Sequence, residues 1–133
     1  MKYLLDTNIC IYIIKEKPKS VIKKFEQISP MEVGVSTITV AELEFGVAKS
    51  QYPEKNRKAL EWFILPLIIL PFNLEDTRAY GDIRHHLESK GTPIGAMDML
   101  IAAQARQREV ILVSNNEQEF SRIPGLKVEN WVE

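Results

Sequence analysis

Short apolar runs alternate with amphipathic stretches along this chain. Runs this short and this nearly uninterrupted are typical of strands that are buried on both faces. The predicted strands are residues 3–5, 33–36, 67–70 and 110–113, with a last one near 126–128. Between them, apolar residues recur at helical spacing. The predicted helices are 7–17, a second one after Pro18 through Ile28, 39–49, 53–65, 74–90 and 96–108, with a short turn or helix at 117–120.

This alternation of strands and helices predicts an α/β fold. Such an order produces a mostly parallel sheet, here of four to five strands, with helices on both faces. The chain has 133 residues, 45% of them hydrophobic, so residues 1–133 are expected to form a single domain. Ligands of these sheets bind beyond the carboxyl ends of the strands. An active site is therefore expected at that edge.

Composition excludes several classes of protein. A net charge of −1 argues against a DNA-coating role. It does not argue against a nuclease, because metal ions bound at the active site would neutralise its acidic residues. The basic clusters, including the early lysines between residues 15 and 24, are interpreted as solvated helix faces. The single cysteine, Cys10, excludes an internal disulfide and is predicted to be buried. With no signal-peptide core at its start and no apolar run long enough to span a bilayer, the protein is predicted to be cytoplasmic.

Carboxylates occur at the predicted strand ends and helix starts. Asp6 directly follows the first strand, where it is either an N-cap or part of a site. Glu42 is the last residue of the pattern Thr39-x-x-Glu42, so it is either part of a site or one member of a capping box at a helix start. Glu44 is a rival acid that faces about 200° away on a helix. The pattern alone does not choose between Glu42 and Glu44.

Two further segments add acids to the same edge. Asp98 lies in the first turn of an almost wholly apolar helix, so an ionised carboxylate there needs a partner or a metal ion. The polar run from Ser114 to Phe120 follows the fourth strand. Several oxygen ligands without a His or Cys cluster favour Mg²⁺ or Mn²⁺ over zinc. Phosphodiester hydrolysis is the reaction that such a site would support.

Four blocks of the sequence, in this order, resemble one family. They are Tyr3-Leu4-Leu5-Asp6-Thr7-Asn8, Val35 to Leu43 with Gly46, Gly95 to Ala103, and Val113-Ser114-Asn115-Asn116 with Glu119-Phe120. Together they resemble the VapC-type toxins, which are PIN-domain ribonucleases of bacterial toxin–antitoxin pairs. The resemblance implies a PIN-like three-layer fold.

The resemblance also implies roles for individual residues. It selects Glu42 over Glu44 and makes Asp6 and Asp98 the principal metal ligands. These carboxylates would also be the catalytic residues.

The resemblance also implies residues that support the ligands, and it leaves the fourth ligand open. Thr7, Asn8, Ser114 and Asn116 would hold the site by hydrogen bonds. Many PIN domains have an Asp where this chain has Asn116. Glu119 is the expected fourth carboxylate, with Glu117 as the weaker candidate.

The family's activity and partners follow from the same resemblance. It implies Mg²⁺- or Mn²⁺-dependent cleavage of RNA, often tRNA, blocked by a VapB-type antitoxin, with a homodimeric toxin that contacts DNA only through the antitoxin. The amphipathic stretches 7–28 and 39–47 could form a groove for an antitoxin helix or belong to the core. Two alternatives stay open. One is a metal-dependent phosphatase, which would need an acid where Asn8 stands, and the other is a non-catalytic binding module on the same fold.

Overall fold

Five parallel strands form one sheet in the computed structural model, which describes residues 1–132. The strands are β1 (Tyr3–Leu5), β2 (Val33–Ser36), β3 (Ile68–Leu70), β4 (Ile111–Val113) and β5 (Lys127–Glu129). Their order across the sheet is β3-β2-β1-β4-β5, and every neighbouring pair is parallel. The predicted parallel sheet is confirmed. Its carboxyl edge, where all five strands end, has β1 at the centre.

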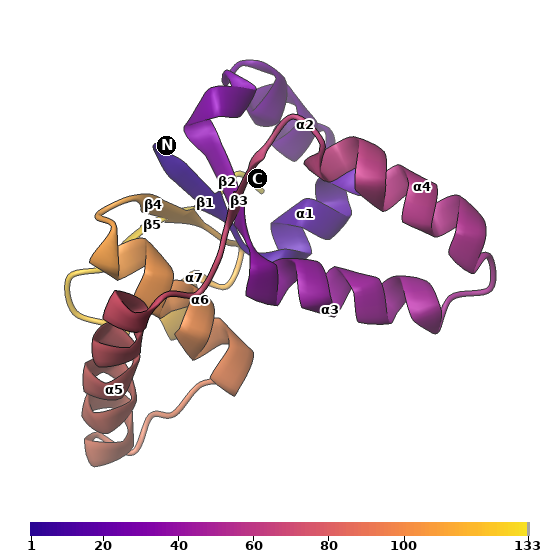
Figure 1. Ribbon diagram of the computed structural model, residues 1–133. Helices are drawn as coiled ribbons and strands as arrows, with labels where there is room; N and C mark the ends of the chain where they lie inside the picture. Colours follow the sequence, from indigo (N-terminus) through magenta and orange to yellow (C-terminus); the bar gives the residue numbers. More distant parts are fainter. Residues whose placement is uncertain (133) are drawn as a thin grey trace.

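Helices cover both faces of this sheet (Figure 1). They are α1 (Thr7–Ile14), α2 (Lys19–Glu26), α3 (Thr37–Ala48), α4 (Pro53–Ile64), α5 (Leu74–Ser89), α6 (Ala96–Gln107) and the short α7 (Glu117–Phe120), with a 3₁₀ turn at Pro30–Glu32. Helices α1 to α4 lie on one side, and α5 and α6 lie on the other (Figure 1). The predicted three-layer α/β architecture is therefore confirmed. Within residues 1–132, no helix combines the length and apolar character needed to cross a membrane.

The alternation of side chains along β1 divides the core into two halves. Tyr3 and Leu5 pack among the residues of α1 to α4, whereas Leu4 packs among those of α5 and α6. This is the two-residue period of a strand that is buried on both faces. Cys10 lies in the first of these halves and is fully buried, as predicted.

Helix α3 corrects one sequence prediction. It begins at Thr37, two residues early, because the hydroxyl of Ser36 accepts a hydrogen bond from the backbone N–H of Ile38 and caps it. The predicted capping box of Thr39 and Glu42 is therefore wrong. Thr39 is fully buried, and Glu42 lies in the second turn of the helix rather than the first. That turn carries the Glu42 side chain toward α1.

Candidate metal centre

Asp6 occupies the centre of the carboxyl edge, directly after β1. Its side chain caps α1, with Oδ1 accepting from the backbone N–H of Ile9 at 2.9 Å, and it is only 4% exposed. Burial raises its pKa from 3.8 to about 6. The hydroxyl of Ser114 and the Ile9 N–H lower it, and the charges of Asp98 and Glu42 raise it further. The carboxylate thus caps a helix, and its surroundings disfavour its ionised form.

Glu42 reaches the same place from α3. Its Oε1 accepts a hydrogen bond of 2.6 Å from the hydroxyl of Thr7, which also lies 3.3 Å from the hydroxyl of Thr39. Glu44 lies on the other side of the helix, where its carboxylate is exposed and pairs with Arg57 at 3.4 Å. The structure therefore brings Glu42, and not Glu44, to Asp6.

Asp98 and Glu119 complete the group of acids. Asp98 lies in the first turn of α6, and burial raises its pKa, with the charges of Glu42 and Glu119 acting in the same direction. Glu119 lies in α7, where its Oε2 accepts a hydrogen bond of 2.8 Å from the side-chain amide of Asn116. Glu117 on the same turn is exposed. Of the two candidates for the fourth carboxylate, Glu119 is the one whose charge acts on Asp98.

The remaining predicted residues separate into two kinds. Ser114 is fully buried, and its hydroxyl bonds Asp6 and also accepts from the backbone N–H of Asn116 at 2.9 Å. Thr7 and Asn116 hold the two glutamates, as described above. Asn8, in contrast, is exposed on α1, and within residues 1–132 its side chain makes no hydrogen bond. Three of the four residues predicted to support the acids, Thr7, Ser114 and Asn116, therefore form hydrogen bonds with them.

Two contacts of this site had no sequence prediction. Thr39 approaches Thr7 because Thr39, Leu43 and Val47 are the buried positions of α3, spaced four residues apart. The side-chain amide of Asn115 donates to the phenol oxygen of Tyr12 at 3.0 Å, which ties α1 to the loop after β4. The four-residue spacing is the one signal by which Thr39 could have been found.

The four acids repel one another without a neighbouring cation. In the part of the chain that the structure describes, no ion pair involves Asp6, Glu42, Asp98 or Glu119. The ion pairs are Lys24–Glu129, Arg57–Glu44, Arg84–Glu88 and Arg108–Asp76. Ionised carboxylates that are partly buried together without a counter-charge are unfavourable. A bound cation would remove this penalty.

The donor set suits a hard divalent cation. Each carboxylate offers about four lone-pair sites, and the hydrogen bonds to Thr7, Asn116 and Ile9 each engage only one oxygen. The Oδ1 of Asn115, beside Ser114, is buried and has no hydrogen-bond partner among residues 1–132. In the side-chain conformations of the same residues, no three His, Cys, Asp or Glu side chains already meet closely enough to hold an ion. The residues fit Mg²⁺ or Mn²⁺ in type and charge, and these ions retain bound waters that fill their remaining positions.

Comparison with known proteins decides the family. The model of the PIN domain matches residues 3–126. The chain belongs to the PIN-domain family. This PIN domain is 46% identical to Ribonuclease VapC2 of Haemophilus influenzae over 132 residues, which cover 99% of both chains. It is 40% identical to the tRNA(fMet)-specific endonuclease VapC of Shigella flexneri, over 98% of both. These full-length relatives make it a VapC-type PIN domain, as the sequence blocks predicted.

A solved structure agrees with this assignment. VapBC2 from Rickettsia felis, bound to a DNA fragment from its promoter, contains a chain that superposes on this PIN domain with a TM-score of 0.93. The two are 42% identical, and the match covers 99% of this chain and 100% of that one. The PIN fold predicted from the four sequence blocks is therefore confirmed over the 99% of this chain that the match covers.

Proposed function

We propose that this protein is a divalent-metal-dependent endoribonuclease, built as a single PIN domain over residues 1–133, and the toxin of a toxin–antitoxin pair. The observation that carries the proposal is the group of four uncompensated carboxylates at the carboxyl edge of the sheet. Asp6 and Asp98 are its principal metal ligands, and Glu42 and Glu119 complete the set. Mg²⁺ or Mn²⁺ is the cofactor, because the donors are oxygens of hard, charged groups.

The residues of the chain position the acids for hydrolysis of an RNA phosphodiester bond. Thr7 fixes Glu42, Asn116 fixes Glu119, and Ser114 orients Asp6. Such partners set the direction of a ligand and its basicity. When bound, the ion would lower the pKa of a water, orient the phosphate and neutralise charge on the leaving oxygen. With Asp6 nearly inaccessible to solvent, these charges act in a medium that screens them weakly.

Substrate and partners are proposed from the relatives. The Shigella flexneri relative is named for tRNA(fMet) and the Rickettsia felis structure for a VapBC pair on DNA. We assign tRNA as the substrate and a VapB-type antitoxin as the inhibitor, with DNA contacted only through the antitoxin. The toxin acts in the cytoplasm as a homodimer.

A groove beside Glu42 supports the antitoxin assignment. It has a volume of about 380 Å³ and lies between α1, α3 and α4. Its apolar lining includes Ile11, Ile14, Leu43 and Val47. An antitoxin helix with an apolar face would fit such a groove, and there it would lie next to the carboxylates.

The phosphatase alternative loses its support at Asn8. That reaction needs a second acid two residues after Asp6, and the residue there is an exposed amide that takes no part in the hydrogen bonds to Asp6 and Glu42. Nothing favours it over RNA cleavage. A non-catalytic module, in turn, would have no use for four buried or half-buried acids that destabilise one another.

Replacing Glu42 by glutamine tests the proposed function. The amide oxygen can still accept from Thr7, so the fold should be retained while one ligand charge is lost. We expect RNA cleavage in Mg²⁺ to fall by about 100-fold, since partners of metal ligands alone cost about 10- to 100-fold. Glu44→Gln is the matched control, because Glu44 is on the same helix but pairs with Arg57. Wild-type RNA cleavage that persists in EDTA, or equal rates for the two variants, would contradict the proposal.

The fourth carboxylate has a test of its own. We expect Glu119→Gln to reduce cleavage by roughly 10-fold and to raise the Mg²⁺ concentration needed for half-maximal rate, because a ligand charge beside Asp98 is lost. Glu117→Gln, on the exposed side of α7, is expected to leave both quantities unchanged. A titration of cleavage rate against Mg²⁺ measures both. The reverse ranking of the two variants would assign the fourth ligand to Glu117.

A further inference from the structure

A strip of lysines that runs from the end of α1 along α2 has no role in the site described so far. It consists of Lys15, Lys17, Lys19, Lys23 and Lys24. With Glu16 and Glu26 it gives residues 15–27 a net charge of +3, in a chain whose net charge is −1. Among residues 1–132, Lys24 alone of the five forms an ion pair, at 3.9 Å from Glu129. The strip is therefore a concentration of positive charge, and its other four lysines form no ion pair within residues 1–132.

One end of the lysine strip lies against the end of β5, at the carboxyl edge of the sheet. Glu129 ends β5, and its backbone carbonyl accepts from the N–H of Ser114, whose hydroxyl bonds Asp6. Neighbouring strands lie about 4.8 Å apart, so Glu129, two strands away from Asp6, is about 10 Å from it. Lys24 lies against Glu129. One end of the strip is thus close enough for a single polymer to contact both it and the site.

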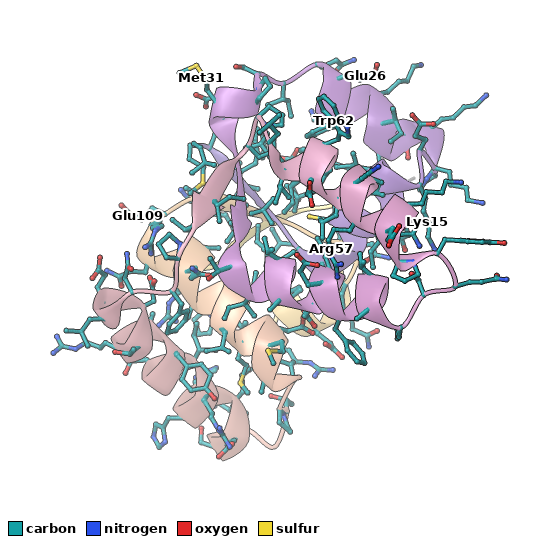
Figure 2. All side chains as sticks on the ribbon, turned by 45° about the vertical axis from the view of Figure 1, so that its right-hand side comes forward. Lys15, Glu26, Met31, Arg57, Trp62 and Glu109 are labelled. Carbon is teal, nitrogen blue, oxygen red and sulfur yellow. The ribbon has the colours of Figure 1, made fainter. Side chains whose placement is uncertain are left out.

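The lysines of the strip also line two hollows in the surface. Lys19, Lys23 and Lys24 line a hollow of about 360 Å³ along α2. A second hollow holds Lys15 and Lys17 next to Tyr12, whose phenol oxygen accepts from Asn115 at the carboxyl edge. Figure 2 shows Lys15 at the outer margin of the molecule, where side chains extend away from the ribbon. Lysines interleaved with an aromatic ring are typical of surfaces that bind single-stranded nucleic acid.

We propose that the lysine strip binds the phosphate backbone of the RNA substrate and guides it to the carboxylates. This inference rests on the proposed endoribonuclease function. RNA must approach four acids of its own charge sign, and adjacent positive charge offsets that repulsion. Phosphate contacts by lysine supply affinity without sequence preference. Four of these lysines are exposed, in keeping with the solvated helix faces expected from the sequence, and the proposal adds a binding role to them.

The test compares two pairs of lysines of equal charge. Lys19→Gln with Lys23→Gln removes two of the five positive charges of the strip. Lys2→Gln with Lys127→Gln removes two exposed lysines at the amino ends of β1 and β5, the opposite edge of the sheet. Cleavage in Mg²⁺ and anisotropy of a fluorescein-labelled single-stranded RNA in EDTA are measured over a range of salt concentrations. Thermal melting checks that both variants fold.

Only the strip variant should lose affinity. Each lost contact to single-stranded RNA reduces the steepness of log K against log salt by about 0.7. Loss of two contacts therefore weakens the binding constant by about 25-fold at 0.1 M salt, relative to the effect at 1 M. We expect KM and Kd to rise by that order at 0.1 M salt and kcat to be unchanged. Lys19→Arg with Lys23→Arg should bind RNA as the wild type does, because the charge is retained.

Three results would overturn the inference. One is equal RNA affinity for the two variants. Another is a loss of kcat at unchanged KM. The third is unchanged RNA binding with weakened binding of poly-glutamate, which would assign the strip to an acidic protein partner. Absence of cleavage by the wild type would instead refute the proposed function, while the anisotropy measurement would still test the strip.

Discussion

Replacing Asp6 by asparagine is expected to abolish RNA cleavage while making the metal-free protein more stable. The asparagine Oδ1 can keep the helix cap to Ile9, and the amide can donate to Ser114, so the local structure should be retained. Cleavage should fall by roughly 1000-fold or more, since a direct ligand is worth more than the residues that support it. The two effects have one cause, because the buried charge that binds the ion destabilises the fold without it.

The size of the stability change follows from the pKa of Asp6. Burial and the neighbouring acids raise that pKa from 3.8 to about 6 in the folded protein. The folded state then holds the proton more tightly than the unfolded state, so folding weakens as the pH rises from about 4 through about 6. Above that window the full penalty applies, about 3 kcal/mol at most. In EDTA at pH 7, we expect Asp6→Asn to raise the free energy of unfolding by about 1–3 kcal/mol.

Denaturant unfolding at several pH values measures this prediction. In EDTA the wild type should gain stability between pH 7 and pH 5, and the difference from Asp6→Asn should shrink over the same range. Added Mg²⁺ should stabilise the wild type, because ligands that bind only the folded state do so, and should leave the variant unchanged. A variant that is less stable than the wild type in EDTA at pH 7 would show that Asp6 acts mainly as a helix cap.

The architecture could be predicted from the sequence because its signals are local. A strand buried on both faces is a short apolar run, and the run at Tyr3–Leu5 stops at the charged Asp6. A parallel sheet then requires the carboxyl ends of its strands to share one edge, so the approximate place of the site follows from the strand order alone. Asp98 could be placed for a similar reason, since a charged residue at the start of an apolar helix has few stable surroundings.

One detail failed locally, and the details that the pattern left open depend on contacts between distant segments. Thr39 and Glu42 have the pattern of a capping box, and Ser36 caps the helix instead because β2 runs directly into α3. The choice of Glu42 over Glu44 needs the position of Thr7, which is 35 residues away from Glu42. The lysine strip is visible in the sequence, but its nearness to the site depends on β5 lying two strands from β1. Periodicity does not contain such information.

An ion pair that the sequence did not indicate is expected to control the stability of the second helical layer. Asp76 is fully buried in the first turn of α5, where its Oδ2 accepts from the backbone N–H of Asn73 at 2.7 Å. Its Oδ1 pairs with Arg108, which follows the last turn of α6 and is 19% exposed. The pair therefore fastens the start of α5 to the end of α6, the helix whose other end carries Asp98.

Removing the arginine should cost more than any other surface-accessible substitution proposed for this chain. In Arg108→Met, Asp76 stays buried without its counter-charge, and breaking a buried pair in this way costs about 3–5 kcal/mol. For a domain of this length that corresponds to a fall in Tm of about 10–20 °C. RNA cleavage should be lost at the temperature where the variant unfolds and should be near the wild-type rate well below it.

Two further variants separate the buried charge from the lost contact. Arg84→Met removes a direct pair with Glu88 whose side chains are 52% and 54% exposed, so we expect a much smaller fall in Tm than for Arg108→Met. Adding Asp76→Asn to Arg108→Met removes the buried charge of Asp76 that has lost its partner. The amide oxygen of the asparagine can still accept from the backbone N–H of Asn73. Thermal melting should then show most of the lost stability restored. If the double variant is no more stable than Arg108→Met, the arginine stabilises the fold through its packing and not through the charge of Asp76.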